Sequence, residues 1–439
     1  MKIVTRLRSA ANRELLVNAG SMIGTTVVTS GLGFLYWWLA ARQFPAEIVG
    51  FASAAISAMS LLGTIGIVGL GTLLIGELPR QTTQRGALVT TALVVAALAS
   101  GLLGLLFALI APVVSVEFQP LASDGLTVLL FVAGVVLTGM TLVLDQALIG
   151  LLRGSLQLWR NAIFALVKLL ALLPLSLWLS DTTGLGIYGT WLLGNLVSLA
   201  GLAGIVVAAR LRVRVHAPQW NVLRKLSGAA LSHHALNLAL QLPGLGLPIV
   251  VTGLLSAALN ASFYMAWLML NLVFAIPYTL TTVLYAVGMA DRATFAHKMR
   301  LTLSMATAIG VVSNIVVWLS ADLLMGVFGP SYAAQAAWTL RIVGLGVFPL
   351  IVKDHYVAIR RVHEQIPPTA ALITLGSLLE LGLAALGARF DGLSGLSIGF
   401  VIALYLEGLL MARTVYRAAL IPPAPEWQPV EPLPASNSA

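Results

Sequence analysis

Residues 86–111 read GALVTTALVVAALASGLLGLLFALIA, a run without a single charged side chain, and Arg80 and Arg85 lie just before it. A helix needs about 20 consecutive apolar residues to cross the hydrocarbon core of a bilayer. This run is therefore long enough to span a membrane, and it decides the fold class. We predict an all-α polytopic membrane protein.

The composition of the whole chain agrees with that class. Hydrophobic residues make up 59% of the 439 residues and charged residues only 9%, against about 25% charged in soluble domains. This excludes a soluble enzyme, a nucleic-acid-binding domain and a disordered protein. The chain has no cysteine, which excludes disulfides, iron–sulfur clusters and thiolate zinc sites.

Eleven further apolar windows accompany the first one along the chain. All twelve windows are 17–41, 48–76, 86–111, 126–150, 161–180, 186–209, 227–256, 261–289, 301–321, 335–359, 367–388 and 394–413. The window 17–41 follows a basic N-terminus, and its length predicts a retained transmembrane helix rather than a cleaved signal peptide. The sequence therefore predicts twelve transmembrane helices.

Basic residues outside the windows predict the orientation of the chain. Of the 25 Lys and Arg residues, 20 fall on the side of the two termini, two (Arg42 and Arg389) on the other side and three inside windows. Because positively charged segments stay in the cytoplasm, both termini are predicted to be cytoplasmic. The protein is then a multi-pass protein of the cell (inner) membrane. The Pro-rich residues 418–439 are predicted to be a disordered cytoplasmic tail.

A basic segment over residues 210–226 divides the windows into two sets of six. We predict an N-terminal lobe over residues 1–209, a cytoplasmic linker over 210–226 and a C-terminal lobe over 227–417. A shift of 209 residues superimposes the windows of the two halves. Since six is an even number, both halves enter the membrane in the same sense, which predicts a parallel repeat with a substrate site between the lobes.

Polar side chains recur at helical spacing in the first two windows of each half. The four stripes are Asn18, Thr25, Thr29 and Tyr36; Ser53, Ser57, Ser60, Thr64 and Gly71; His234, Asn237 and Gln241; and Tyr264, Trp267, Asn271, Tyr278, Thr282 and Tyr285. Polar side chains in a membrane face protein or water, so the stripes are expected to line a tall cavity.

The candidate substrate-binding residues in these stripes are Asn18, Thr25, Tyr36, His234, Asn237, Gln241, Asn271 and Tyr278. Tyr and Trp beside Asn suit sugar rings, because they offer apolar faces with hydrogen-bonding edges. Close helix packing is the alternative explanation for the small residues of the second stripe.

Charged residues inside the windows cost roughly 2.5–3.5 kcal/mol each at mid-membrane, so they are expected to be paired. Asp145 and Lys168 lie at equal depth on adjacent helices if the loop between them is centred near residue 156, which predicts a salt bridge. Lys353 and Glu380 straddle the loop between the tenth and eleventh windows, and their long side chains can bridge the difference in depth. We interpret both pairs as structural or gating devices.

Arg341, Glu407 and the neighbouring His233 and His234 have no such local partner, and an unpaired ionisable group in a membrane is a functional candidate. Glu407 is a candidate for coupling to H⁺ or Na⁺. Arg341 is a candidate phosphate ligand because its planar guanidinium donates two hydrogen bonds at once; the alternative is an anchor to the outer headgroups. The histidines either titrate near neutral pH or serve packing.

Several short motifs resemble those of polysaccharide flippases. They are Arg42-Gln43-Phe44-Pro45-Ala46-Glu47-Ile48-Val49-Gly50, Gly66-Ile67-Val68-Gly69-Leu70-Gly71, Leu78-Pro79-Arg80, Leu144-Asp145-Gln146 with Gly150 and Arg153, and Phe328-Gly329-Pro330-Ser331-Tyr332. The resemblance extends to about residue 417 and is to the superfamily of multidrug, oligosaccharidyl-lipid and polysaccharide exporters.

That resemblance implies two six-helix lobes forming a V around a central cavity. It also implies movement of a polyprenyl-pyrophosphate-linked oligosaccharide from the cytoplasmic to the outer leaflet. Such flippases often have a cationic cavity, whereas the four stripes hold only histidine as a possible cation. Arg341 and Lys353 are therefore expected to supply most of any positive field.

The leading hypothesis is an alternating-access flippase for a lipid-linked saccharide in surface polysaccharide synthesis, acting as a monomer without a cofactor, metal, nucleotide or nucleic acid. A cation-coupled multidrug exporter of the same fold is the alternative. A glycan polymerase or ligase is less favoured because the outer loops are short and their charges scattered. The chain has no GxxxxGK[ST] phosphate loop, which excludes ATP-driven transport by this chain alone. The GxSG match at Gly392–Gly395 has no later histidine to serve as a protease base.

Overall fold

The computed structural model describes residues 24–26, 28–80, 84–178, 183–210, 216–221, 228–290 and 295–420, and this part of the chain contains helices and no strand. The elements are α2 (Ala46–Gly66), α3 (Leu70–Glu77), α4 (Arg85–Val114), the 3₁₀ helix η1 (Val116–Ala122), α5 (Gly125–Gly150), α6 (Gly154–Trp178), α7 (Leu185–Ala208), α8 (Gly228–Leu254), α9 (Ala257–Ala290), α10 (Phe295–Gly326), α11 (Pro330–Gly344), α12 (Val347–Val362) and α13 (Ile366–Leu420). Residues 28–43 form a further helix before α2. Asn18 and most of the predicted linker and tail lie outside the described residues.

Nine of the described helices are long and apolar enough to cross a membrane, and α11 with α12, bent by 45°, supply a tenth candidate. Helix α13 has 55 residues, which would make a straight helix about 80 Å long, far more than a bilayer requires. Its backbone leaves the helical conformation at Asp391 and Gly392, so it contains two runs of spanning length. The helix over 28–43 overlaps the first predicted window, so each of the twelve windows contains helix among the described residues.

The second predicted window, 48–76, is not one straight helix. It breaks between α2 and α3, where Val68 and Gly69 have φ angles of 48° and 77°, a backbone region that favours glycine. Hydropathy does not reveal this break because the residues on both sides remain apolar.

The tenth predicted window, 335–359, breaks between α11 and α12. The Asn314 side chain donates a hydrogen bond to the carbonyl of Gly344 at 2.6 Å, and the Tyr405 hydroxyl donates one to the carbonyl of Leu345 at 3.3 Å. These two side chains replace helical hydrogen bonds that the bend removes, as a membrane interior requires.

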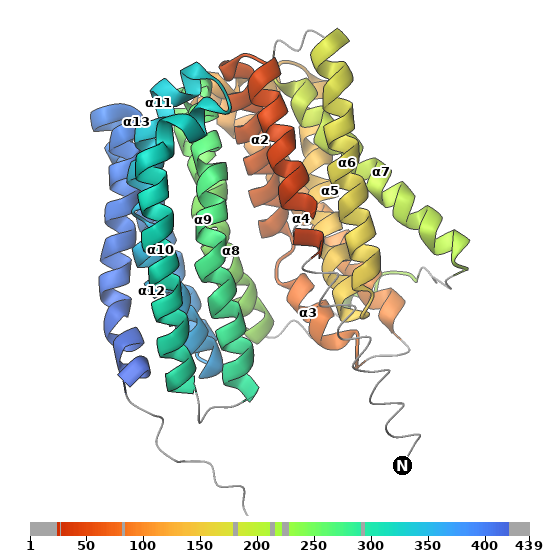
Figure 1. Ribbon diagram of the computed structural model, residues 1–439. Coiled ribbons are helices and arrows are strands. Elements are labelled where there is room, and N and C mark those ends of the chain that lie inside the picture. The colour runs from red at the N-terminus through yellow and green to blue at the C-terminus, as the bar shows by residue number, and fades with distance from the viewer. Residues whose placement is uncertain are drawn as a thin grey trace, which may run out of the picture.

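The helices form two lobes that lie side by side (Figure 1). The helix over 28–43 and α2–α7 make up the N-terminal lobe, and α8–α13 make up the C-terminal lobe. Helix α2 lies between them and packs against α8 and α9. We call the end of the molecule with α3 and the 151–153 turn the basic end, and the end with η1 and the start of α11 the opposite end.

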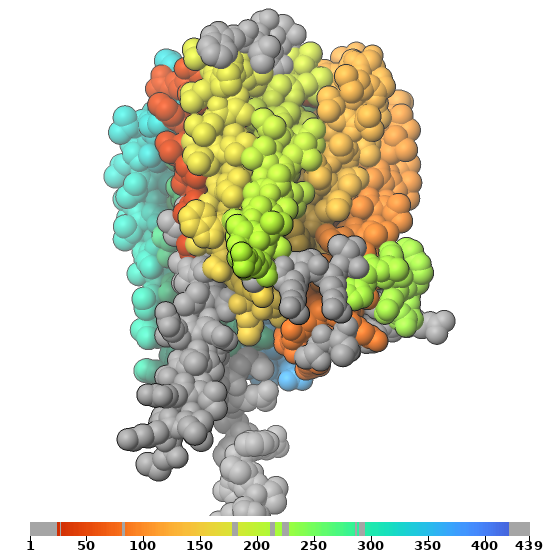
Figure 2. All heavy atoms as spheres, turned by 90° about the vertical axis from the view of Figure 1, so that its right-hand side faces the viewer, coloured from red at the N-terminus to blue at the C-terminus, as the bar shows by residue number. Residues whose placement is uncertain are grey.

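The face of the N-terminal lobe turned away from the C-terminal lobe is covered by α6 and α7 (Figure 2). Exposed side chains of these two helices are apolar, among them Leu166, Leu170, Leu177, Leu193 and Leu196. Such side chains match the hydrocarbon of a bilayer, so we assign this face to lipid contact.

The hydrophobic core is shared between the lobes only toward the opposite end. One cluster of buried residues joins the two lobes there, from Phe118 and Phe131 to Phe263, Phe328 and Phe400. Toward the basic end the core divides into one cluster in the N-terminal lobe and another in the C-terminal lobe. The lobes therefore share a hydrophobic core at one end, whereas toward the basic end they meet where α2 and α3 contact α8.

The tightest contact between the lobes is a glycine contact between α2 and α9. A Cβ atom added to Gly50 would lie 1.6 Å from the carbonyl oxygen of Ala257, so only glycine permits this approach. The buried Asn260 donates hydrogen bonds to the Gly50 carbonyl at 2.8 Å and to the Ser53 hydroxyl at 2.9 Å. The shift of 209 residues that relates the two halves places position 50 of α2 on position 259 of α9, between Ala257 and Asn260, which contact Gly50. Equivalent positions of two related helices are expected to meet at the axis that relates the two lobes.

Further polar contacts between the lobes lie at the same end. The Glu117 carboxylate accepts a hydrogen bond from the Ala257 amide at 3.0 Å, at the N-terminus of α9, where the helix dipole favours an anion. Arg42 and Trp38 both donate to the carbonyl of Val327, at 2.9 and 3.1 Å. The opposite end is therefore closed by direct contact between the lobes.

We predict that Gly50→Ala moves the lobes apart at the opposite end, because the added methyl group cannot fit against Ala257. Gly189→Ala is the matched control, since nothing lies within 4 Å of a Cβ at that position. The chain is free of cysteine, so spin labels at Ser123→Cys and Ser331→Cys report the distance between the lobes by pulsed electron resonance. A longer distance in Gly50→Ala alone is expected. An unchanged distance would show that the contact does not hold this end closed.

Candidate functional site

A cavity of about 230 Å³ lies between the lobes, on the basic side of the α2–α9 contact. Its lining residues are Met59, Ser60 and Thr64 from α2; Thr138, Thr141, Leu142 and Asp145 from α5; Arg160, Asn161 and Phe164 from α6; Trp191 and Asn195 from α7; and Gln241 and Leu245 from α8. Both lobes therefore contribute to it, as a parallel repeat predicts, but the N-terminal lobe supplies every charged residue.

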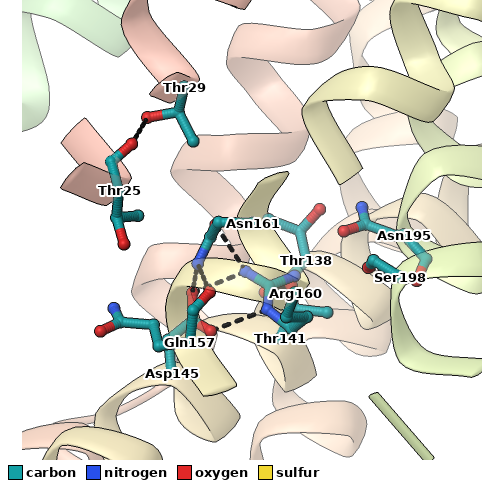
Figure 3. A network of polar contacts seen from close by, with 10 residues as sticks. All are labelled: Thr25, Thr29, Thr138, Thr141, Asp145, Gln157, Arg160, Asn161, Asn195 and Ser198. Atoms are coloured by element: carbon teal, nitrogen blue, oxygen red, sulfur yellow. Dashed lines mark hydrogen bonds and ion pairs between the residues drawn. The ribbon is translucent and has the colours of Figure 1, made fainter. Parts of the chain in front are cut away.

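The centre of the polar wall is the ion pair of Asp145 with Arg160 (Figure 3). Arg160 donates two hydrogen bonds, from Nε to Oδ1 at 2.8 Å and from Nη2 to Oδ2 at 2.6 Å. Asn161 donates a third to Oδ2 at 3.1 Å. The two charged side chains are 12% and 5% exposed, so the carboxylate receives three donors in place of water.

The predicted salt bridge of Asp145 with Lys168 is wrong. Helix α5 ends at Gly150 and α6 begins at Gly154, so the turn between them is centred on Leu152 and not near residue 156. The residue at the depth of Asp145 on the returning helix is then Arg160. The fifth predicted window begins only at residue 161, which places Arg160 among the basic loop residues. The two glycines that flank the short turn were the available signal.

Hydrogen-bond donors on the cavity wall lack partners, whereas the carboxylate acceptors are occupied. Arg160 Nη1, Trp191 Nε1 and Thr138 Oγ1 are buried and have no hydrogen-bond partner within the part of the chain that the structure describes. Both oxygens of Asp145 accept hydrogen bonds. A buried donor without an acceptor is costly, so this wall is suited to a ligand that is rich in acceptor oxygens.

Lys168 lies behind this wall, in the interior of the N-terminal lobe. Its Nζ is 3.7 Å from the ring centroid of Trp191, 4.9 Å from that of Phe164 and 5.2 Å from that of Tyr36. The residue is 5% exposed. Such a cage favours a cation through the electron-rich faces of the rings, and two of its rings, Phe164 and Trp191, also line the cavity.

The C-terminal lobe holds a buried ion triad. Lys353 Nζ lies 2.6 Å from Glu380 Oε1, which confirms the predicted pair, and 2.9 Å from Glu407 Oε2. The expectation that Glu407 has no partner is therefore wrong. The two runs of α13 pack closely here, because a Cβ at Gly376 would lie 2.4 Å from the Glu407 carboxyl carbon. Glu407 thereby reaches a lysine that belongs to α12.

Two predicted substrate ligands belong to the first helix. Tyr36 is fully buried, and its hydroxyl is hydrogen-bonded to the Ile187 carbonyl at 3.1 Å and to Thr190 Oγ1 at 2.7 Å. It does not line the cavity in this conformation, so the expectation that it lines one is wrong here. Thr25 is half-buried next to Gly24, which packs on Leu158 of α6, and it is not a lining residue either.

The predicted ligands on α8 and α9 are only partly brought together. Gln241 lines the cavity and donates to the Asn237 carbonyl at 3.1 Å. The Asn237 side chain accepts from Arg361 at 2.9 Å, and the half-buried His234 is not a lining residue of the cavity. Asn271 is exposed away from the cavity lining. Tyr278 lines a separate, smaller cavity beside Asp354 and Arg361.

Arg341 is not an unpaired cation, as the sequence suggested. It forms an ion pair with Asp322 and donates to the Trp318 carbonyl at 3.2 Å. Its guanidinium also lies 5.9 Å from the ring of Trp338. Trp318 and Trp338 are both exposed, as in the aromatic belt of a membrane interface. The structure thus favours the anchor interpretation of Arg341 over the phosphate ligand.

The fold is similar to solved transporters, although no protein-family model and no curated protein sequence matches the chain. An inward-facing multidrug resistance MATE transporter of the MOP superfamily matches with a TM-score of 0.67 at 14% identity, over 90% of this chain and 98% of that one. The lipid II flippase MurJ in an inward closed conformation gives 0.68 at 11%, over 90% and 89%.

An outward-facing MATE structure gives a lower TM-score of 0.59 at the same 14% identity, over 92% of this chain and 96% of that one. The resemblance found in the sequence is therefore confirmed at the level of the fold, which this chain shares with the MATE and MurJ structures.

We predict that Asp145→Asn and Arg160→Met each destabilise the folded protein, because each leaves one buried charge unpaired, at a cost of roughly 3–5 kcal/mol. The double variant should recover part of that loss. Thermal midpoints in detergent, followed by size-exclusion chromatography, measure all three. Lys168→Met serves as the control and should not rescue Asp145→Asn. Rescue by Lys168→Met, or no rescue by Arg160→Met, would contradict the pairing.

Proposed function

We propose that the protein moves a polyprenyl-diphosphate-linked saccharide from the basic side of the membrane to the other side by alternating access. The observation that carries this proposal is the set of unpartnered donors on the cavity wall, Arg160 Nη1, Trp191 Nε1 and Thr138 Oγ1. Phosphate and sugar oxygens are acceptors, and an arginine that is already held by a carboxylate still presents a fixed donor to phosphate.

The size and the lining of the cavity support a headgroup site. Its volume of about 230 Å³ is below the range of roughly 300–1,000 Å³ common for small-molecule sites. In this conformation it therefore holds the diphosphate with its first sugar rather than a whole oligosaccharide. Trp191 and Phe164 offer ring faces, and Asn161, Asn195 and Gln241 offer amides, a combination that suits a sugar.

The orientation and the role of the opposite end belong to the same proposal. We assign the basic end to the cytoplasm because of the positive-inside rule. The headgroup enters from that side, and separation of α2 from α9 at Gly50 would release it on the other side. The protein then acts in the synthesis of a surface polysaccharide in the cell membrane.

Export of cationic drugs is the second candidate, since MATE transporters share the fold. Such a substrate favours a free carboxylate in the cavity, and both oxygens of Asp145, the one carboxylate among the lining residues that the structure describes, are occupied by donors. Coupling to a cation would have to use Glu380 and Glu407. Lys353 already occupies the space between these two carboxylates, so it supplies there the positive charge that a coupling ion would bring.

We predict that the purified protein in liposomes moves a fluorescent short-chain polyprenyl diphosphate saccharide between leaflets, measured by loss of fluorescence to dithionite. A diphosphate carries about two negative charges, and its outward movement gains roughly 2.3 kcal/mol per charge per 100 mV, inside negative. An imposed potential should therefore accelerate it more than a pH gradient does.

The matched control for this assay is ethidium, a cationic substrate of the alternative function, in the same vesicles. Movement of ethidium without movement of the diphosphate lipid, or a larger effect of the pH gradient than of the potential, would favour the drug exporter.

A further inference from the structure

Lys168 is a buried lysine that has no anionic partner among the described residues. Its residue is 5% exposed, and its ammonium makes no hydrogen bond or ion pair within the described part of the chain, only ring contacts. The carboxylate that could neutralise it, Asp145, is bound at both oxygens by Arg160 and Asn161. Rings favour a cation, but they do not neutralise its charge.

One side of the cage around Lys168 is held by hydrogen bonds, and the other is held by ring contacts alone. The Tyr36 hydroxyl is held by two hydrogen bonds, to Ile187 and Thr190. Trp191 is the ring nearest to the ammonium, and its Nε1 has no hydrogen-bond partner among the described residues. Because Trp191 also lines the cavity, its ring is the partition between the ammonium and the substrate.

Lys168 follows Arg160 by two helical turns on α6. Eight residues at a rise of 1.5 Å correspond to about 12 Å along the helix axis. Since α6 runs from the basic end to the opposite end, Arg160 lies nearer the entrance and Lys168 lies deeper. A headgroup that moves toward the opposite end would meet the two cations one after the other.

The cage is also linked to the contact between the lobes. Trp37 lies beside Trp191, with ring centroids 6.5 Å apart, and beside Tyr264 of α9 in the other lobe, at 4.7 Å. Separation of α9 from the N-terminal lobe would therefore remove a neighbour from the rings that cover Lys168.

We propose that Lys168 is a second diphosphate-binding residue, covered by the Trp191 ring in this conformation and uncovered as the lobes separate at the opposite end. This inference rests on the proposed function. It extends that function from one anion-binding residue to two, with Arg160 binding the diphosphate on entry and Lys168 binding it during passage. It also restricts the substrate to a diphosphate carried by a lipid.

The test is a binding experiment with farnesyl diphosphate on the full chain in detergent, with farnesol as the uncharged probe. Lys168→Met has similar length without the charge, and Lys298→Met on α10 is the matched control outside the cavity lining. The parent should bind farnesyl diphosphate at least tenfold more tightly than farnesol. Lys168→Met should lose about tenfold for the diphosphate and nothing for farnesol, with an unchanged or higher melting temperature.

Trp191→Ala separates a binding role of Lys168 from a structural one. Because Trp191 Nε1 is itself one of the donors that we assign to the ligand, the readout is the effect of Lys168→Met in two backgrounds. Lys168→Met should weaken farnesyl diphosphate binding severalfold more in the Trp191→Ala chain, where the ring no longer covers the ammonium, than in the parent. A lysine that serves packing alone would leave the effect of Trp191→Ala the same with and without the charge, and this result would overturn the inference.

The remaining outcomes separate the inference from the proposed function. If the parent prefers the diphosphate and Lys168→Met binds it within twofold of the parent, the inference fails and the proposed function stands. If the parent does not distinguish farnesyl diphosphate from farnesol, the proposed function fails and the inference with it. Inorganic pyrophosphate should compete weakly; competition equal to that of farnesyl diphosphate would overturn the assignment to a lipid.

Discussion

Helices α2 and α9 meet at Gly50, where the backbones approach so closely that a single methyl group would overlap the Ala257 carbonyl. The closure of the opposite end depends on this contact, and Asn260 and Glu117 add hydrogen bonds to it. The shared hydrophobic core lies on the same side, whereas each lobe has its own core at the basic end. The cavity between the lobes lies on the basic side of this contact, beyond the shared core.

The buried charged residues of the two lobes differ in their access to the cavity. In the C-terminal lobe, Lys353 is enclosed by Glu380 and Glu407, and no lining residue of the large cavity belongs to this triad. In the N-terminal lobe, Asp145 fixes Arg160 on the cavity wall and leaves one guanidinium nitrogen free for a ligand. A buried ion pair contributes little net stability to a fold. We therefore infer that Asp145 serves to position Arg160 Nη1 as a donor on the cavity wall.

The sequence predicts the helical class and most helix positions, because runs of apolar residues report directly on burial in lipid. It also predicts the pair of Lys353 with Glu380. It does not predict Arg160 as the partner of Asp145, since that choice depends on a turn of three residues whose length hydropathy cannot resolve. Hydropathy also does not predict the helix breaks at Gly69 and Leu345, because the residues around each break remain apolar. The first break depends on backbone conformation, and the second is stabilised by hydrogen bonds from the side chains of Asn314 and Tyr405. Helical periodicity places Tyr36 on a polar stripe, but it cannot show that the Tyr36 hydroxyl is hydrogen-bonded to Ile187 and Thr190 of its own lobe.

The central claim is that the cavity between the lobes takes up the diphosphate headgroup at Arg160. A cryo-electron microscopy structure of the full chain with farnesyl diphosphate tests this most directly. We expect density for the phosphates within hydrogen-bonding distance of Arg160 Nη1, with the lobes still in contact at Gly50. Density for the phosphates elsewhere, for example beside Arg341 or in the smaller cavity at Asp354, with the Arg160 cavity empty, would contradict the account.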